Sequence, residues 1–451
     1  MIRRVVIMLS LALTGCDTVP LEQPPTRAQI SDSALPPVKR FATPRPVPPQ
    51  RSNSDMARDF LDLHFKLEGG SSLPIFTRFE GPITVRVTGQ PTQNLNSDLS
   101  SLLSRLQREA GIDIRRVSNG SANITIESVS REQIRKALPR AACFVVPNVS
   151  SLAEFRRSKR RASTNWSQLR QRDRLAIFLP NDVSPQEVRD CLHEELAQAI
   201  GPLNDHYRLP DSVFNDDNVH TVLTGFDMLI LRATYAPGLR TGMNRAEVAA
   251  QLPAIFSRYN PRGNGLRSAP LAETPRNWIT AVEASLGPGI DSRTRKQAAS
   301  QATAIAQREG WSDHRLAFSH YILARMIQVS EPEMAQKHFS TAMHHLGTSP
   351  STQLHRALIS TRMAAYDITL GRGRSALSAI EPSISTAARF ENAALLSTLM
   401  LLKAEALEIT GNHDGANSVR LDSLGWARYG FGSDWSVRAK MNEIAALRPN
   451  T

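Results

Sequence analysis

The residues best suited to chemistry are concentrated in residues 191–205, which read CLHEELAQAIGPLND. A zinc-binding helix needs two histidines one turn apart, with a glutamate beside the first as general base. His193 and Glu194 begin that pattern, but the residue one turn further on is Ala197. Gln198 lies five residues after His193, about 140° round a helix, so these two side chains cannot converge on one metal. An ordinary zinc site at His193 is therefore excluded.

Aligning the metal-binding pattern one residue later, from Glu194, selects a different set of candidate residues. Glu195 then takes the position of the general base, and the candidate metal ligands are Glu194, Gln198, Asn204 and Asp205. These ligands offer only oxygen atoms, which suit a harder divalent cation such as calcium better than zinc. Without a metal, nothing would lower the pKa of water from 15.7 towards about 7. The pattern leaves a non-zinc cation open and argues against an ordinary zinc peptidase.

Clear start and stop signals delimit the helix that carries these residues. Ser184 and Glu187 form a capping box around Pro185, which occupies the first helical position. Gly201 closes the helix and is followed by a proline. The sequence therefore predicts a helix from Pro185 to about residue 200.

Short strands and further helices alternate around this helix. Residues 82–87 and 122–127 predict half-buried strands, and the apolar runs 144–146 and 175–179 predict buried ones. Leucines at one-turn intervals predict an amphipathic helix between the first two strands; they are Leu99, Leu102, Leu103 and Leu106. Residues 55–260 are therefore expected to form an α+β domain.

The spacing of this segment resembles that of the metzincin metallopeptidases, whose pattern is H-E-x-x-H-x-x-G-x-x-H. Residues 224–235 are similar to the metzincin C-terminal helix, and residues 211–216 resemble the Met-turn, with Phe214 where Met normally lies. The residues at this turn are Ser212, Phe214 and Asn215. The resemblance implies a zincin fold for residues 55–260.

A closer resemblance is to the bacterial "domain of unknown function 2927" family, which carries E-E-x-x-Q-x-x-G-x-x-N-D. Three interpretations of the polar residues remain open. They could form an internally satisfied polar network, or line a cleft that binds a peptide or glycan without cutting it. In the third, Glu195 deprotonates water while its neighbours hold a non-zinc metal or the substrate.

The N-terminus predicts export and lipid anchoring. Residues 1–15 have the positive start and short apolar run of a secretory signal, and the sequence LTGC ending at Cys16 resembles the lipobox of bacterial lipoproteins. Residues 16–54 would be the lipidated cysteine and a proline-rich extended linker. The protein should lie in the cell envelope, facing the periplasm, and Asp17 favours the inner membrane.

Export also affects how the net charge and the cysteines are interpreted. The net charge of +12 favours anionic neighbours, but export argues against nucleic acid. Cys143 and Cys191 remain once Cys16 is lipidated, and an oxidising compartment would join them in a disulfide. The basic run at residues 156–161 is interpreted as a solvated loop, with a docking patch for anionic surfaces as the alternative.

Residues 266–451 read as an all-α array. Ala335, Ala376 and Ala416 recur at intervals of 41 and 40 residues, each in a helix that follows a short turn. Three helix pairs can be recognised, with a fourth less regular pair around residues 277–310. The array resembles tetratricopeptide-type repeats, which implies a groove for a protein or peptide partner. A compact bundle that supports the preceding domain is the alternative.

Together these features predict a lipid-anchored envelope protein with a degenerate metallopeptidase-like domain. Its expected role is a binding module or scaffold for an envelope partner. The alternative is a non-standard metallohydrolase or peptidase with Glu195 as general base. No phosphate-binding loop, Ser-His-Asp order or dinucleotide fingerprint suggests another chemistry.

Overall fold

The structure is a computed structural model that describes residues 35–41 and 46–449. The predicted signal peptide, Cys16, Asp17 and most of the predicted linker lie outside the described residues. Within the described ranges, no helix combines the length and the apolar character needed to cross a bilayer.

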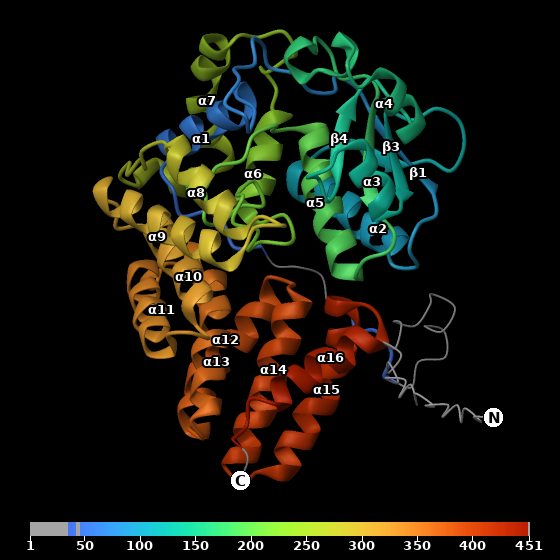
Figure 1. Cartoon of the computed structure of the whole chain (residues 1–451). Helices are drawn as coiled ribbons and strands as arrows, with labels where there is room; N and C mark the ends of the chain where they lie inside the picture. The colour runs from blue at the N-terminus through green and yellow to red at the C-terminus, as the bar shows by residue number, and fades with distance from the viewer. Residues whose placement is uncertain (1–34, 42–45, 450–451) are drawn as a thin grey trace, which may run out of the picture. The chain divides into compact units, whose positions relative to one another are not determined.

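A five-stranded, mostly parallel sheet forms the centre of the first half of the chain (Figure 1). Its strands are β1 (Ile83–Gly89), β2 (Ile114–Arg116), β3 (Ile124–Val129), β4 (Phe144–Pro147) and β5 (Leu175–Pro180). They lie in the order β2-β1-β3-β5-β4, and only β4 runs antiparallel to its neighbour. The four predicted strands are confirmed, and β2 was not predicted.

The domain is α/β rather than the predicted α+β. Parallel strands need crossover connections: one helix lies between the parallel neighbours β1 and β2, and two helices lie between the parallel neighbours β3 and β5. The first helices are α1 (Asn53–Phe65), α2 (Leu95–Arg105), the π-helix η2 (Leu106–Ala110), α3 (Arg131–Ala137) and α4 (Leu152–Ser158). They are followed by α5 (Pro185–Ile200), α6 (Gly225–Thr234) and α7 (Arg245–Tyr259). Short 3-10 turns are η3 (Ala162–Thr164), η4 (Trp166–Gln168) and η5 (Pro261–Gly265).

Apolar side chains cover both faces of this sheet. On one face, Ile83, Ile126 and Ile177 belong to the core that also contains the apolar residues of α1, α2, α5, α6 and α7. On the other face, Phe144 and Phe178 pack with Phe155 of α4 and Ile134 of α3. The basic run at residues 156–161 begins in the last turn of α4 and continues into an exposed turn.

The second half of the chain is helical, as predicted. The helices are α8 (Arg276–Leu286), α9 (Ser292–Arg308), α10 (His314–Ile327), α11 (Pro332–Leu346), α12 (Gln353–Thr369), α13 (Gly373–Arg389), α14 (Ala393–Ile409), α15 (His413–Phe431) and α16 (Asp434–Ala445), with the 3-10 turn η6 (Pro350–Thr352). Ala335, Ala376 and Ala416 are fully buried, near the starts of α11, α13 and α15. The fourth pair is also present, as α8 and α9. Small residues at these positions let paired helices approach closely.

Residues 35–41 and 46–52, here called the N-terminal strap, lie against the folded chain without regular secondary structure. The backbone N–H of Lys39 donates to the carbonyl of Gly425 at 3.1 Å, and Phe41 stacks on Trp426. Arg51 forms ion pairs with Asp59 of α1 and with Asp211. The described end of the predicted linker is therefore extended chain that is held in place rather than free.

Candidate functional site

Helix α5 is held firmly at both ends. The Ser184 hydroxyl accepts a hydrogen bond from the backbone N–H of Glu187, which confirms the predicted N-terminus. At the other end, the buried guanidinium of Arg172 donates to the carbonyls of Gln198, Ala199 and Gly201 at 2.6–2.8 Å. These bonds satisfy carbonyl groups that a helix end leaves without partners. The residues along α5 are thus fixed relative to the sheet.

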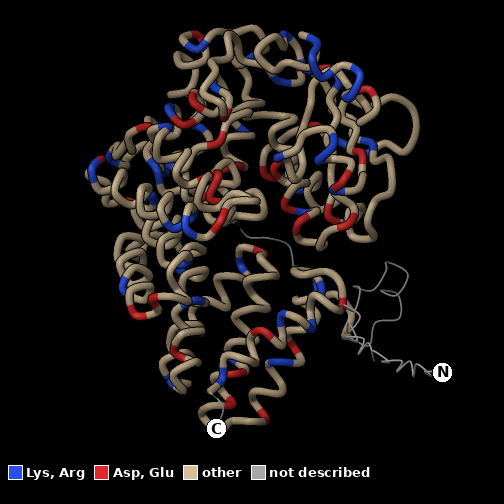
Figure 2. Tube along the Cα trace, viewed as in Figure 1, with Lys and Arg blue, Asp and Glu red and all other residues tan. Residues whose placement is uncertain are grey.

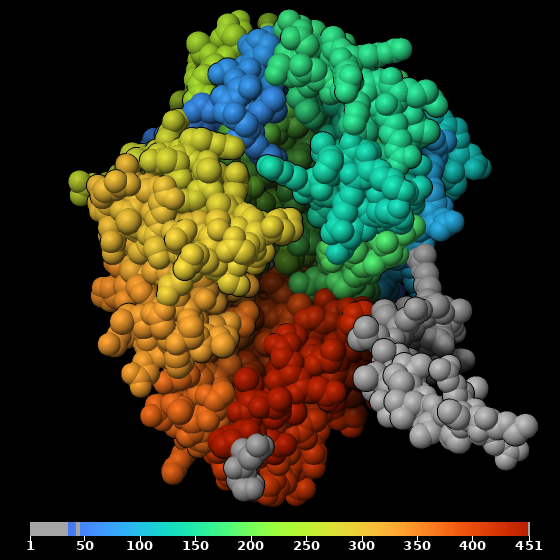
Figure 3. Space-filling view, in the orientation of Figure 1, coloured from blue at the N-terminus to red at the C-terminus, as the bar shows by residue number. Residues whose placement is uncertain are grey.

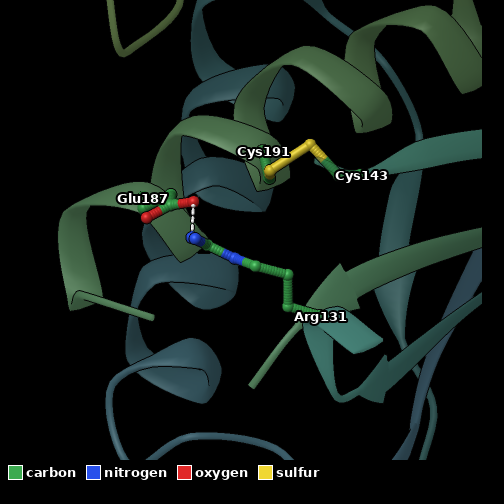
Figure 4. Close-up of a disulfide and its surroundings, with 4 residues drawn as sticks. All are labelled: Arg131, Cys143, Glu187 and Cys191. Atoms are coloured by element: carbon green, nitrogen blue, oxygen red, sulfur yellow. Dashed lines mark hydrogen bonds and ion pairs between the residues drawn. A yellow bond between two sulfur atoms is a disulfide. The ribbon is translucent and has the colours of Figure 1, made fainter. Parts of the chain in front are cut away.

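A disulfide ties the middle of α5 to the chain beside β4. The predicted bond between Cys143 and Cys191 is confirmed, with an S–S distance of 2.07 Å (Figure 4). Figure 4 also shows Arg131, at the start of α3, paired with Glu187 in the first turn of α5. Both contacts hold α5 against the β4 and α3 side of the sheet.

His193 is a structural side chain rather than a ligand. It is 1% exposed, and its Nδ1 accepts a hydrogen bond from the backbone N–H of Leu223 at 3.1 Å. Burial, together with the nearby arginines Arg189 and Arg105, holds the pKa of His193 well below its usual value. The imidazole is therefore neutral and engaged, in agreement with the exclusion of an ordinary zinc site.

The adjacent face of α5 belongs to a group of acidic side chains, here called the carboxylate cluster: Glu68, Asp190, Glu194, Glu195, Asp205 and Asp216. Burial raises the pKa of every member, and neighbouring carboxylates raise it further for all except Glu68. The pKa of Glu194 rises to about 8 and that of Asp190 to about 7. The structure thus brings together three of the predicted site residues, Glu194, Glu195 and Asp205.

The carboxylate cluster forms no ion pair with a basic side chain in the described part of the chain, and only Asp216 interacts with an arginine, Arg276, at longer range. Glu195 is 5% exposed and its Oε2 has no hydrogen-bond partner, and the same holds for the buried Oδ1 of Asp205. Buried polar atoms are normally satisfied, so these two oxygens mark a site that is incomplete within the described chain.

Helix α8 borders the cluster. Asp216 interacts electrostatically with Glu283 and Arg276, both of α8. The surface is hollowed between the yellow helices α8 and α9 and the green and cyan elements of the sheet-bearing part (Figure 3). Acidic residues lie on both sides of this hollow, whereas Lys and Arg gather towards α4 and the chain after it (Figure 2).

Two of the four predicted metal ligands, Gln198 and Asn204, are not members of the carboxylate cluster. The side-chain amide of Asn204 donates to the carbonyl of Asp62 at 3.0 Å and lies 3.0 Å from Nε2 of His206, so Asn204 is engaged away from the cluster. Gln198 is 8% exposed, and its side chain forms no hydrogen bond with other described residues. Across the described ranges, no three His, Cys, Asp or Glu side chains are placed to hold a metal.

The catalytic zinc that a metzincin resemblance implies does not fit this site. Zinc favours imidazole and thiolate ligands, whereas the cluster offers carboxylate oxygens only. The nearest histidine on the helix is bonded to Leu223. The cluster therefore lacks the ligands of a catalytic zinc site.

The predicted turn at Ser212, Phe214 and Asn215 is a buried structural turn. The Ser212 hydroxyl donates to the carboxylate of Asp227, whose other oxygen accepts from the backbone N–H of Val213 at 3.1 Å. Phe214 is fully buried, and the amide of Asn215 donates to the carbonyl of Leu209 at 3.0 Å. The backbone N–H of His206 donates to the carbonyl of Phe214 at 3.0 Å, so the turn holds the loop residue next to Asp205.

Three cluster members were not predicted from the sequence. Asp190 lies one turn before Glu194, so the helical spacing contained a signal for it. Glu68 and Asp216 come from loops that follow α1 and α5, and only the fold brings them close to the helix.

Comparisons with known proteins agree with part of the predicted resemblance. Residues 53–254 match the family described as protein of unknown function (DUF2927). The match confirms the family resemblance for this segment, called the DUF2927 segment below, and covers the sheet, α5, and the helices up to most of α7. No curated protein and no solved structure matches the chain.

Proposed function

We propose that the DUF2927 segment is a binding module that takes up a basic group of an envelope partner at the carboxylate cluster. The observation that carries the proposal is the absence of counter-charges around Glu194, Glu195 and Asp205 in the described residues. Like charges at close range disfavour ionisation, and a cationic group placed among them restores it. A lysine or arginine of a partner would supply the charge that the chain itself does not.

The state of Glu195 favours binding over hydrolysis. Burial and the neighbouring Glu194 and Glu68 hold the pKa of Glu195 well above its usual value. A raised pKa keeps the carboxyl group protonated over a wider pH range, and a protonated carboxyl group cannot take a proton from water. Glu195 acts as a general base only after a cation has lowered its pKa, so binding precedes any chemistry at this site.

The second candidate function is a non-standard metallohydrolase or peptidase. It is favoured by the position of Glu195 beside Glu194 and by the unsatisfied Oε2 of Glu195. Elemental analysis of the full chain, purified without chelators or a histidine tag, separates the candidates. About one equivalent of divalent metal, lost in Glu194→Ala, would establish this second function; a metal-free folded protein agrees with the binding module.

We also propose that the DUF2927 segment is metzincin-like. The proposal is supported by the end of α5 at Gly201, by the buried turn around Phe214, and by α6 directly after it. The lipid anchor at Cys16 and an envelope location facing the periplasm are proposed on the sequence alone. The disulfide between Cys143 and Cys191 supports an oxidising compartment.

The helical array is proposed to bind a protein or peptide partner in the manner of tetratricopeptide-type repeats. The pairing of α8 with α9, α10 with α11, α12 with α13, and α14 with α15 supports this interpretation. Exposed apolar side chains near the turns of two pairs, Val329, Met334 and Leu370, offer contact area. A partner could thus span the array and present a basic residue to the cluster.

Calorimetric titration of the full chain with trilysine at low salt tests the binding proposal, with triglutamine as the uncharged control. We expect trilysine to bind, and the double variant Glu194→Gln/Asp205→Asn to weaken binding at least tenfold. Glu132→Gln/Glu333→Gln removes the same charge at other sites and should change the affinity less than twofold. Equal binding by both double variants would refute the proposal.

A further inference from the structure

A cavity lies against the face of α5 that carries Arg189 and His193, next to the face that carries the carboxylate cluster. Its volume is about 410 Å³, and Arg189 and His193 of α5 contribute to its wall. One face of α2 and strap residues 40 and 41 form much of the remainder. A cavity of this size lies within the range of small-molecule sites.

Basic side chains outnumber acidic ones in this cavity. Four arginines line it, Arg40, Arg105, Arg108 and Arg189, against the two acids Asp98 and Glu391. Arg189 is neutralised by Glu391 in a buried ion pair. Arg40 and Arg108 are exposed and form no ion pair in the described chain; Arg108 donates to the hydroxyl of Ser104.

Arg105 provides an independent indication of a ligand. Its side chain is 3% exposed, and its Nε and Nη2 donate to Glu109 at 2.9 and 3.0 Å. Its Nη1 has no acceptor among the described residues. A buried guanidinium donor without an acceptor is costly, and an anionic oxygen from a ligand would satisfy it.

Hydroxyl groups add to the donor character of this cavity. Four serines of α2 line it, Ser97, Ser100, Ser101 and Ser104. The hydroxyls of Ser97 and Ser100 already donate to backbone carbonyls of α2 and the turn before it, so Ser101 and Ser104 are the candidate hydroxyl donors. The Ser104 hydroxyl accepts from Arg108 and so keeps its own hydrogen available for donation. Guanidinium and hydroxyl donors around one cavity match the oxygens of a phosphate group.

We propose that this cavity binds a phosphate ester, with the phosphate between Arg40, Arg105 and Arg108. The site is separate from the carboxylate cluster and does not depend on the function proposed for it. The same chemistry is offered by a soluble phosphate ester and by the headgroup of an anionic phospholipid.

The test uses the full chain and glycerol 3-phosphate as the probe, with glycerol as the uncharged control, in calorimetry at low salt. We expect glycerol 3-phosphate to bind and glycerol not to bind. The double variant Arg40→Gln/Arg108→Gln, which changes two exposed side chains, should weaken binding at least tenfold. The matched variant Arg115→Gln/Arg116→Gln removes two exposed arginines of β2 and should change the affinity less than twofold.

A second arm distinguishes the two sources of phosphate. Co-sedimentation with phosphatidylglycerol vesicles that is lost in Arg40→Gln/Arg108→Gln but retained in Arg115→Gln/Arg116→Gln identifies a lipid headgroup. Binding of glycerol 3-phosphate without such co-sedimentation identifies a soluble ester. The proposal is overturned if glycerol 3-phosphate does not bind, or if both double variants weaken its binding equally.

Discussion

His193 and Glu194 are sequence neighbours that are both neutral at pH 7, for opposite reasons. Burial and nearby arginines lower the pKa of His193, whereas burial and nearby carboxylates raise the pKa of Glu194 to about 8. One face of α5 therefore contacts a basic cavity and the adjacent face an acidic cluster. The protonation of the acidic face should be visible in the stability of the protein.

Because the pKa of Glu194 is higher in the folded chain than its ordinary value of 4.5, the stability it contributes is complete below about pH 4.5 and is lost as the pH rises through about 8. At about 1.4 kcal/mol for each pKa unit, the shift of Glu194 alone corresponds to about 4 kcal/mol at pH 8. Because the cluster shares its protons, Glu194→Gln should recover part of this and raise the free energy of unfolding at pH 8 by roughly 2 kcal/mol. At pH 4, below the ordinary pKa of 4.5, the change should be near zero. Urea denaturation at both pH values measures it.

The exposed pair Glu132 and Lys136 provides the control. Glu132→Gln should leave the stability at pH 8 nearly unchanged, because surface pairs contribute little. If Glu194→Gln instead destabilises the protein at pH 8, the ionised carboxylate of Glu194 has a stabilising partner, which contradicts the cluster as described.

The sequence predicted some of the residues of the carboxylate cluster but not all of them. Ala197 excluded the ordinary zinc helix, and the helical spacing placed Glu194 and Glu195 on α5 correctly. The engagement of Asn204 with Asp62 and the approach of Glu68 depend on contacts across 142 and 126 residues of chain, which no local pattern encodes.

Among the elements, the N-terminal strap is the least expected. Glycines let its backbone approach the fold: a Cβ at Gly225, the first residue of α6, would overlap the carbonyl oxygen of Val47, and a Cβ at Gly425 of α15 would lie 2.9 Å from the carbonyl oxygen of Pro37. The close approach of the strap thus explains why glycine occupies these two helical positions, although glycine is less favourable than alanine in a helix. The proline-rich composition of residues 16–54 predicted extended chain but not these contacts.

Gly225→Ala should displace residues 46–48 and destabilise the protein by about 1–3 kcal/mol, because the added methyl group has no space. Gly81→Ala is the matched control, since a Cβ there meets nothing within 4 Å. Denaturation and the rate of proteolysis within the strap measure the effect. Equal stability of the two variants would mean that the strap does not lie against α6.

The fold class was predicted wrongly because one short strand, β2, was not recognised in the sequence. The strands at residues 82–87 and 175–179 were evident from their apolar patterns, but β2 has three residues, two of which are exposed arginines. Without β2, the parallel pairing of β1 on both sides was not apparent, and α+β was predicted instead of α/β. The helical repeat was predicted well because its contacts are between helices adjacent in sequence.

For the whole molecule, buried polar contacts connect the sheet-bearing part to the helical array. Arg189 of α5 pairs with Glu391, which precedes α14, and both side chains are nearly inaccessible. His355 of α12 lies 2.8 Å from the carboxylate of Asp217. The backbone N–H of Ala394 donates to the side chain of Gln186 at 2.9 Å. The two parts should therefore unfold together in a single calorimetric transition.

Arg189→Leu should destabilise the protein by about 3–5 kcal/mol and split this transition, because it leaves the carboxylate of Glu391 buried without a counter-charge. The double variant Arg189→Leu/Glu391→Leu should recover part of the loss. Arg131→Leu breaks the more exposed pair between Arg131 of α3 and Glu187 of α5, and should cost under about 1 kcal/mol. An unsplit transition in Arg189→Leu would show that this pair does not couple the two parts.

The most direct test of the central claim counts the protons released when a cation enters the carboxylate cluster. The measurement is calorimetric titration of the full chain with trilysine at pH 7 in two buffers that differ in ionisation enthalpy. A cationic group lowers the raised pKa values of the cluster, so we expect about one proton to be released for each trilysine bound, and none in Glu194→Gln/Asp205→Asn. Binding without proton release, or no binding at all, would contradict the account.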